Sequence, residues 1–221
     1  GTVTYTQAAS NGDGLYLSGS NLTLDHNLIH DNSDDGLHGH TSTATLINTT
    51  VADNADEGVY METGGSATVR NTAITGSGSY GIWNNGSTVN ISYSNIYDSY
   101  QGNYAGISNP IGSSGNISRE PYYNSDYTLQ EHSQLVDAGD PNDPYGNEPS
   151  GQGPGRIDIG RFGNTSQPTT TTTTAVANGD FDGSLGRPWD HIFFTAAQGQ
   201  TWDRVSGVHP GKNGTYYIST C

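Results

Sequence analysis

Acidic residues that recur at an interval of 22 are the first groups whose spacing suggests chemistry. Two sets of three appear in the same order: Asp31, Asp34 and Asp35, then Asp53, Asp56 and Glu57. If 22 residues return the chain to an adjacent strand, equivalent carboxylates lie within about 5 Å of one another. Their repulsion is relieved by a cation or by a rise in pKa, and Ca²⁺ prefers such oxygen ligands. Two interpretations stay open: a bound calcium ion, or an acidic edge screened by solvent.

Four histidines lie near these acids in the sequence: His26, His30, His38 and His40. A carboxylate pair with a neighbouring histidine suits the acid–base chemistry of a glycoside hydrolase. His26 and His30 lack a third ligand at metal-binding spacing. Ordinary surface histidines are the simpler interpretation, so we assign no catalytic residue.

A ring side chain follows each of four Gly-aliphatic steps at intervals of 22, 22 and 23 residues: Tyr16, His38, Tyr60 and Trp83. Alternation along a strand places these rings opposite the aliphatic residues, on the outside, in a row about 5 Å apart. Such a row suits stacking against the sugars of an extended polymer. The alternative is that the rings stack on one another or pack against residues 97–104.

The elements that would position these groups come from a repeat of 22 to 23 residues. The segments 22–32, 44–54, 67–77 and 89–99 share two aliphatic columns. The columns are Leu24, Leu46, Val69 and Ile91, and Ile29, Val51, Ile74 and Ile96. Short β-branched stretches between Gly, Asn, Asp and Ser predict strands and turns. One coil buries too little apolar surface to fold alone, so stacked coils must stabilise one another, as in a parallel β-helix.

Small polar residues recur at two further positions of each copy. They are Asn27, Thr49, Thr72 and Ser94, and Asn32, Asn54, Ser77 and Ser99. Asn and Ser tolerate tight bends, and stacked Asn amides can bond to one another. We interpret both columns as structural turn ladders.

A non-repeating tail follows Tyr100, with the segments NISREP at 116–121, DYTLQ at 126–130, SQLVDAGDP at 133–141 and RIDIGRFG at 156–163. It resembles the C-terminal end of secreted bacterial right-handed β-helix proteins of the pectate-lyase-like superfamily, with Glu120 in place of the usual Asp and Gln134 where Pro is common. The resemblance covers about residues 11–163 and implies architecture more than activity, because the superfamily includes lyases, epimerases, hydrolases and surface proteins. Its lyases use a Lys or Arg base, and Arg70 is the only such residue in 1–118.

We therefore expect an all-β chain in three parts. A right-handed parallel β-helix with its closing segment occupies residues 1–163, and a Thr-rich linker occupies 164–175. Residues 176–221 form a β-rich segment similar to the first strands of carbohydrate-binding jelly rolls, but too short for a complete sandwich of that type. Six consecutive threonines after a proline are typical of an O-glycosylated stalk, which favours an extracellular or cell-surface location.

The charge balance limits the partners. The chain has 22 acidic and 7 basic residues, a net charge of −15, so it lacks the basic patches that nucleic acids and anionic membranes require. The chain contains no run of about 18 apolar residues, so we expect no insertion into a membrane. N-glycosylation sequons begin at Asn21, Asn48, Asn85, Asn90, Asn116, Asn164 and Asn213. A chain this rich in Asn, Ser and Thr yields several sequons by chance, so these residues are candidate sites that would make the chain a glycoprotein.

These features favour a non-catalytic extracellular module that recognises polysaccharide, with calcium as the candidate cofactor. One alternative is the C-terminal part of an enzyme that degrades or modifies polysaccharide, either a lyase, an epimerase or a hydrolase. Another is a subunit of an extracellular filament that forms by self-association, because β-helices stack readily end to end.

Overall fold

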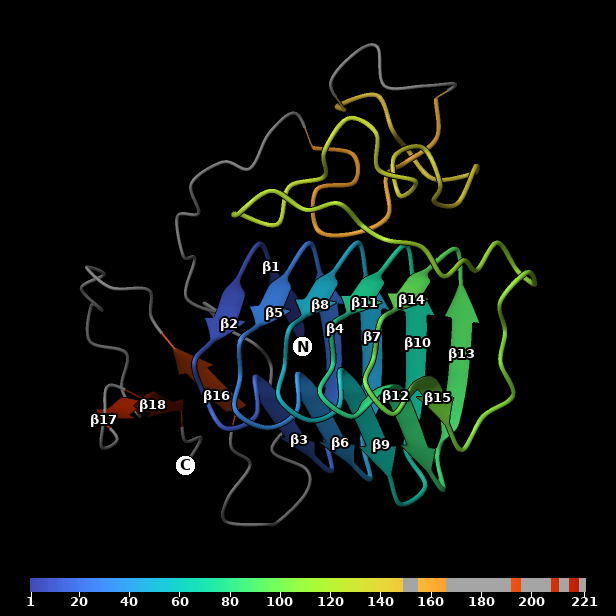
Figure 1. Ribbon diagram of the computed structural model, residues 1–221. Helices are drawn as coiled ribbons and strands as arrows, with labels where there is room; N and C mark the ends of the chain where they lie inside the picture. Colours follow the sequence, from blue (N-terminus) through green and yellow to red (C-terminus); the bar gives the residue numbers. More distant parts are fainter. Residues whose placement is uncertain (149–154, 166–191, 196–207, 211–214, 219–221) are drawn as a thin grey trace.

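Residues 1–105 of the computed structural model wind into five coils of a parallel β-solenoid (Figure 1). The structure describes residues 1–148 and 155–165, together with three strands between residues 192 and 218. Each coil contributes one strand to each of three parallel sheets, and no helix occurs in the described part of the chain. The predicted all-β class and the coil length of 22 to 23 residues are confirmed.

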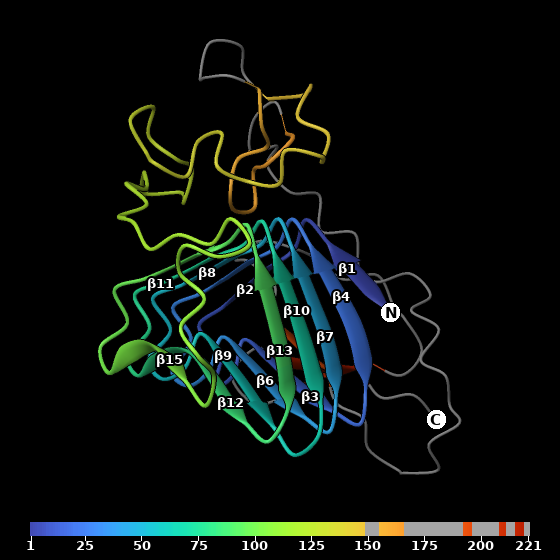
Figure 2. The same ribbon diagram turned by 90° about the vertical axis from the view of Figure 1, so that its right-hand side faces the viewer.

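The three sheets form the walls of a narrow solenoid, as Figure 2 shows in a view close to its axis. Sheet A contains β1 (Thr2–Thr4), β4 (Asn21–Asp25), β7 (Thr43–Ile47), β10 (Ser66–Arg70) and β13 (Thr88–Ser92). Sheet B contains β2 (Gln7–Ala9), β5 (Leu28–His30), β8 (Thr50–Ala52), β11 (Ala73–Thr75) and β14 (Asn95–Tyr97). Sheet C contains β3 (Leu15–Ser18), β6 (Leu37–His40), β9 (Val59–Glu62), β12 (Tyr80–Asn85) and β15 (Gly102–Ala105).

Both predicted aliphatic columns point into the solenoid and keep the predicted register. Leu24 pairs with Leu46, and Val69 with Ile91, in sheet A. The equivalent column of sheet B begins at Ile29 and is buried throughout. Because parallel strands of adjacent coils bond along the axis, each aliphatic side chain packs on the one above it. The core therefore consists of columns of stacked aliphatic side chains, with one side chain from each coil in every column.

The corners of the coils contain left-handed residues and polar ladders. His26, Asn48, Asn71 and Tyr93 all have positive φ angles between 45° and 59°, and each directly precedes a member of the first turn ladder. Within the second ladder, Asn32 Nδ2 donates to Asn54 Oδ1 at 2.8 Å. Left-handed backbone is unfavourable for most side chains, so the ladder hydrogen bonds offset a local cost. Both columns are structural, as predicted.

A glycine directly precedes β3, β6 and β9 and is the second residue of β12, because the backbones of adjacent coils approach closely there. A Cβ atom on Gly36 would lie 2.6 Å from the carbonyl oxygen of Gly58 and 2.6 Å from Val51 Cγ1. Both distances are shorter than real contacts of a Cβ atom. The recurrent Gly-aliphatic-ring step therefore arises from close packing between sheet C and the core column of sheet B.

The tail runs back along the side of the solenoid where sheets A and B meet (Figures 1 and 2, yellow-green to orange). Leu135 and Ile159 are fully buried and cluster with Ala73 of β11. The Gly160 amide donates to the Asn71 carbonyl at 2.9 Å, and the Asp140 amide donates to Asn71 Oδ1 at 2.8 Å. The outer face of sheet B is thus covered by the tail.

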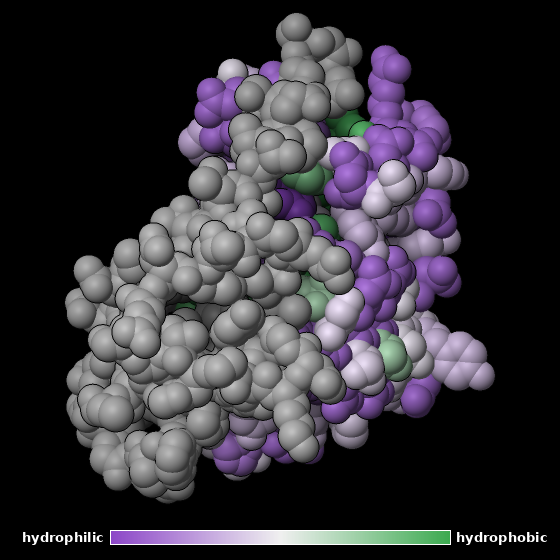
Figure 3. Space-filling view, turned by 90° about the vertical axis from the view of Figure 1, so that its left-hand side faces the viewer, coloured by the Kyte–Doolittle hydropathy of each residue, from purple (hydrophilic) through white to green (hydrophobic). Residues whose placement is uncertain are grey.

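Toward the C-terminus the structure describes an antiparallel sheet of β16 (Ile192–Thr195), β18 (Thr215–Ile218) and β17 (Val208–Pro210). Of the predicted linker at 164–175, only residues 164 and 165 are described by the structure. Asn213 also lies outside the described residues. In Figure 3, the visible surface of the described residues is mostly hydrophilic, in keeping with a mean hydropathy of −0.63.

Candidate functional site

The four ring residues predicted from the sequence form a continuous row on the outer face of sheet C, here called the aromatic ladder. Tyr16, His38, Tyr60 and Trp83 occupy one register position of β3, β6, β9 and β12. Their ring centroids are 4.9, 4.7 and 4.8 Å apart along the row. All four residues are half-buried. The predicted juxtaposition is therefore present, although sugar binding stays a prediction.

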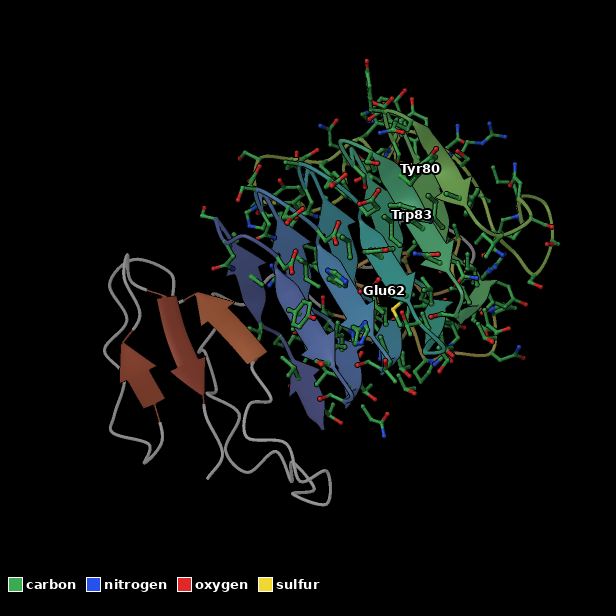
Figure 4. The ribbon with its side chains drawn as sticks, turned by 90° about the horizontal axis from the view of Figure 1, so that it is seen from below. Glu62, Tyr80 and Trp83 are labelled. Carbon is green, nitrogen blue, oxygen red and sulfur yellow. The ribbon has the colours of Figure 1, made fainter. Side chains whose placement is uncertain are left out.

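The rings of the aromatic ladder partly cover one another. Tyr60 and Trp83 are stacked with an interplanar angle of 25°, whereas Tyr16 meets His38 edge-on at 74°. Beyond Trp83 the register continues with Ala105, which has no ring. Tyr80 lies beside Trp83 with the ring centroids 6.2 Å apart (Figure 4). The indole of Trp83 is thus the end of the row, where a planar ligand meets no further stacked ring.

Glu62 gathers polar groups along the aromatic ladder. Its Oε1 atom lies 3.2 Å from His38 Nε2 and 3.1 Å from His40 Nδ1, and its Oε2 atom accepts from the Tyr60 hydroxyl at 3.2 Å. Figure 4 shows Glu62 on the same face as Trp83 and Tyr80. The hydrogen bond from His38 is the main cause that lowers the pKa of Glu62. The carboxylate is therefore held ionised on this face.

A column of acids lies at the corner where sheet C begins. Asp13 Oδ1 accepts from the Asp35 amide at 3.3 Å, and Asp35 Oδ1 accepts from the Glu57 amide at 2.9 Å. Ser79 Oγ donates to Glu57 Oε1 at 2.7 Å. Burial is the main cause that raises the pKa of all three acids. The column is a place where negative charge is poorly solvated.

The acids predicted to bind calcium divide between two corners of the coil. Asp34, Asp35 and Asp56 each place a carboxylate oxygen within 4.8 Å of the others. Asp31 and Asp53 lie elsewhere and meet at the tail, where the Tyr127 hydroxyl is 3.5 Å and 3.0 Å from their Oδ2 atoms. Calcium binding stays a prediction, with a smaller set of ligands than the interval of 22 indicated.

The four histidines are likewise divided. His38 and His40 lie on sheet C, whereas the His26 Nε2 atom is 2.8 Å from the Gly163 carbonyl of the tail. His30 lies against the ring of Tyr127, with the centroids 4.8 Å apart. The cluster near His38 also contains two residues that the sequence analysis did not single out, Asp13 and Glu62. Asp13 had a signal, because it precedes Asp35 by the same interval of 22.

The sequons differ in accessibility. Asn21, Asn85 and Asn90 are exposed, and Asn164 is half-buried. Asn48 and Asn116 are buried, and Asn116 Nδ2 donates to the Ile91 carbonyl at 2.9 Å. A glycan has no room at either buried amide in the folded chain, so the prediction of glycosylation is retained for the accessible sites.

Among the described residues, no helix has the length and apolar character needed to cross a bilayer. A family model described as the right-handed β-helix region matches residues 1–121, which is more than half of the 221 residues. No curated protein and no solved structure matches the chain. The match covers all five coils and agrees with their parallel register. The chain belongs to the right-handed β-helix family, whose fold is that of the pectate-lyase-like superfamily.

Proposed function

We propose that this chain is an extracellular module that recognises a polysaccharide with the outer face of sheet C. The observation that carries the proposal is the aromatic ladder, which ends at the indole of Trp83. Aromatic rings contribute large, rigid contact area against the apolar faces of sugars. Because the inner rings cover one another, Trp83 and its neighbour Tyr80 provide the stacking surface.

Polar groups beside the rings supply directional contacts. Glu62 accepts hydrogen bonds, and the exposed amide of Asn85 donates to the Tyr60 hydroxyl at 3.1 Å. Sugar hydroxyls both donate and accept, so a mixed row of carboxylate, imidazole, phenol and amide groups matches their chemistry. The row runs across successive coils, which suits an extended chain of sugars better than a single one. Glu62 on this face and the column of acids at the adjoining corner favour a neutral polysaccharide over a polyuronate.

The test is affinity electrophoresis against a panel of neutral and uronate polysaccharides, with and without calcium. We expect Trp83→Ala to weaken the binding of a neutral polymer by at least about 10-fold, because it removes the free stacking surface. Tyr100→Ala is the matched control, since Tyr100 is 88% exposed and lies outside the aromatic ladder. Equal binding by Trp83→Ala, or no binding by the parent chain, would contradict the proposal.

The same incubations distinguish a binding module from an enzyme. A pure binding module leaves the polymer length unchanged. Release of reducing ends or unsaturated products would instead support the alternative that the chain is part of a polysaccharide-degrading enzyme. Retention only in the presence of calcium would indicate that the ion is part of the recognition.

A further inference from the structure

The corner before sheet C brings a histidine and two aspartates from adjacent coils to one point. His38 lies on β6, Asp35 precedes that strand by two residues, and Asp13 precedes β3 at the equivalent position. Leu15 pairs with Leu37, so the two aspartates occupy equivalent positions in adjacent coils. The parallel pairing of β3 with β6 therefore fixes the spacing between the two carboxylates, and β6 itself adds the imidazole of His38.

We propose that Asp13, Asp35 and His38 bind a divalent first-row transition-metal ion, such as Zn²⁺. His38 Nδ1 is 3.5 Å from Asp35 Oδ2 and 3.8 Å from Asp13 Oδ2. The three candidate ligand atoms all lie within 4.8 Å of one another. Tetrahedral zinc with bonds of about 2.0–2.1 Å requires its ligands to be about 3.3 Å apart. Small side-chain shifts therefore bring the observed atoms to coordinating distance.

The far side of the His38 ring supports this assignment independently of the two aspartates. Nε2 faces Glu62 Oε1 at 3.2 Å, and the same carboxylate receives the Tyr60 hydroxyl. A carboxylate accepts hydrogen bonds, so a neutral ring that donates from Nε2 to Glu62 keeps its lone pair on Nδ1 for a metal ion. That lone pair lies on the side of Asp13 and Asp35. Metal-binding histidines commonly have such a carboxylate on the remote nitrogen, where it fixes the ring and raises its basicity.

Charge and exposure favour a cation at this point. Residues 1–69 contain no Lys or Arg, so within this range only histidines and the N-terminal amine offset the acids of the first three coils. The side chains of His38 and Asp13 are 20% and 18% exposed, and that of Asp35 is 5% exposed. An ion can reach the site from solvent and still be partly desolvated. Two carboxylates also neutralise a divalent charge when the imidazole is neutral.

The ligand set selects the class of metal. Imidazole with carboxylates suits zinc, cobalt and nickel, whereas calcium takes six to eight oxygen ligands. The acidic group of Asp34, Asp35 and Asp56 shares Asp35 with the proposed site. An ion held by this all-oxygen group would therefore compete for Asp35. Binding at the proposed site requires His38, whereas binding at the all-oxygen group requires Asp34. The proposed metal site does not depend on the proposal that sheet C binds a polysaccharide.

The experiment titrates Zn²⁺ and Co²⁺ into the full chain after treatment with a chelator, using calorimetry and visible absorption. We expect one saturable zinc ion per chain and intense d–d bands from four-coordinate cobalt, which zinc abolishes. Asp13→Asn and His38→Phe should each weaken zinc binding by at least about 10-fold, and Glu62→Leu by about 10-fold. Asp34→Asn is the matched control and should leave the affinity unchanged.

Folding of each variant is checked first by thermal unfolding without metal. His38→Phe keeps a ring in the aromatic ladder, so it decides the matter if Asp13→Asn fails to fold. The cobalt spectrum of the parent chain needs no variant. Absence of saturable binding would overturn the proposal, as would unchanged affinity in His38→Phe. Loss of binding in Asp34→Asn with retention in His38→Phe would assign the ion to the all-oxygen group instead.

Discussion

Sheets B and C run along the same coils, yet their outer faces lie in different surroundings. The outward residues of β8 and β11 in sheet B are small and buried: Thr50, Ala52, Ala73 and Thr75. The tail covers them with Leu135 and Ile159. The outward positions of sheet C carry the aromatic ladder, which is half-buried, and Glu62. Small side chains let a second layer of chain approach a sheet closely, whereas rings and charges occupy the face that the described tail leaves uncovered.

This difference shows how one repeat supports two roles. The inward columns of sheets A and B that contain Leu24 and Ile29 are aliphatic in every coil because each side chain must pack on the next. The outward positions have no such constraint, so they are free to differ between sheets. The covered face of sheet B contributes stability, and the outer face of sheet C carries the groups for which we propose binding.

The largest expected effect follows from a charge in the core that both faces share. Val51 is fully buried on β8 and also contacts the start of β6, where it excludes a Cβ atom at Gly36. Val51→Asp places an unpaired carboxylate there, and we expect a loss of more than about 4 kcal/mol in the free energy of unfolding. Circular dichroism during heating measures this loss. Thr68→Asp, on the exposed side of β10, is the control and should melt like the parent chain.

The second prediction concerns pH and the covered side. Burial is the main cause that raises the pKa of Asp158 in the tail to about 7, above the usual value near 3.9. The folded chain therefore binds this proton more tightly than the unfolded chain. Its contribution to stability falls as the pH rises from about 4 to about 7, and the full penalty persists above that.

Asp158→Asn removes the penalty because the amide does not ionise. In the parent chain the Asp137 amide donates to Asp158 Oδ1 at 2.8 Å, and the side-chain oxygen of the asparagine can still accept this hydrogen bond. We expect the variant to be more stable than the parent chain by about 1–3 kcal/mol at pH 8, and nearly equal to it at pH 4. Urea unfolding at both pH values measures the difference. Glu131→Gln, which removes an exposed carboxylate of the same tail, should show no such gain.

The repeat was predictable from sequence where each coil imposes the same constraint. Leu24, Leu46 and Val69 lie in the predicted register because a mismatch would expose the core. The aromatic ladder followed from alternation about the same columns. Its ring geometry did not follow, because the angles depend on local packing, such as the edge contact between Tyr16 and His38.

The path of the tail was not predictable in the same way. Tyr127 reaches Asp53 across 74 residues and Asp31 across 96 residues. Such contacts are set by packing between non-repeating segments, and no periodicity reports them. The interval of 22 correctly placed Asp31 with Asp53, whereas nearness in the sequence grouped Asp31 with Asp34, which belongs to different surroundings. Asp13 could have been found from the sequence, because it precedes Asp35 by the same interval of 22.

The smallest predicted effect compares one substitution on the two faces. Tyr127→Phe removes the hydroxyl by which the tail donates to Asp53 at 3.0 Å. Asp53 is exposed, so solvent replaces part of this bond, and we expect a loss of about 1 kcal/mol. Tyr60→Phe removes a hydroxyl from the open side, where solvent replaces the bond to Glu62, so the loss should stay below about 0.5 kcal/mol.

Urea unfolding of both variants at pH 7 provides the comparison, because the two substitutions remove the same atom from a ring that keeps its packing. A larger loss for Tyr127→Phe would support the view that the tail stabilises the solenoid through sheet B. Equal losses would contradict that view, since the phenol of Tyr60 would then be as important to the fold as the phenol of Tyr127 in the tail. In that case the open face of sheet C would itself be a structural surface, and its rings would be needed mainly to hold the coils together.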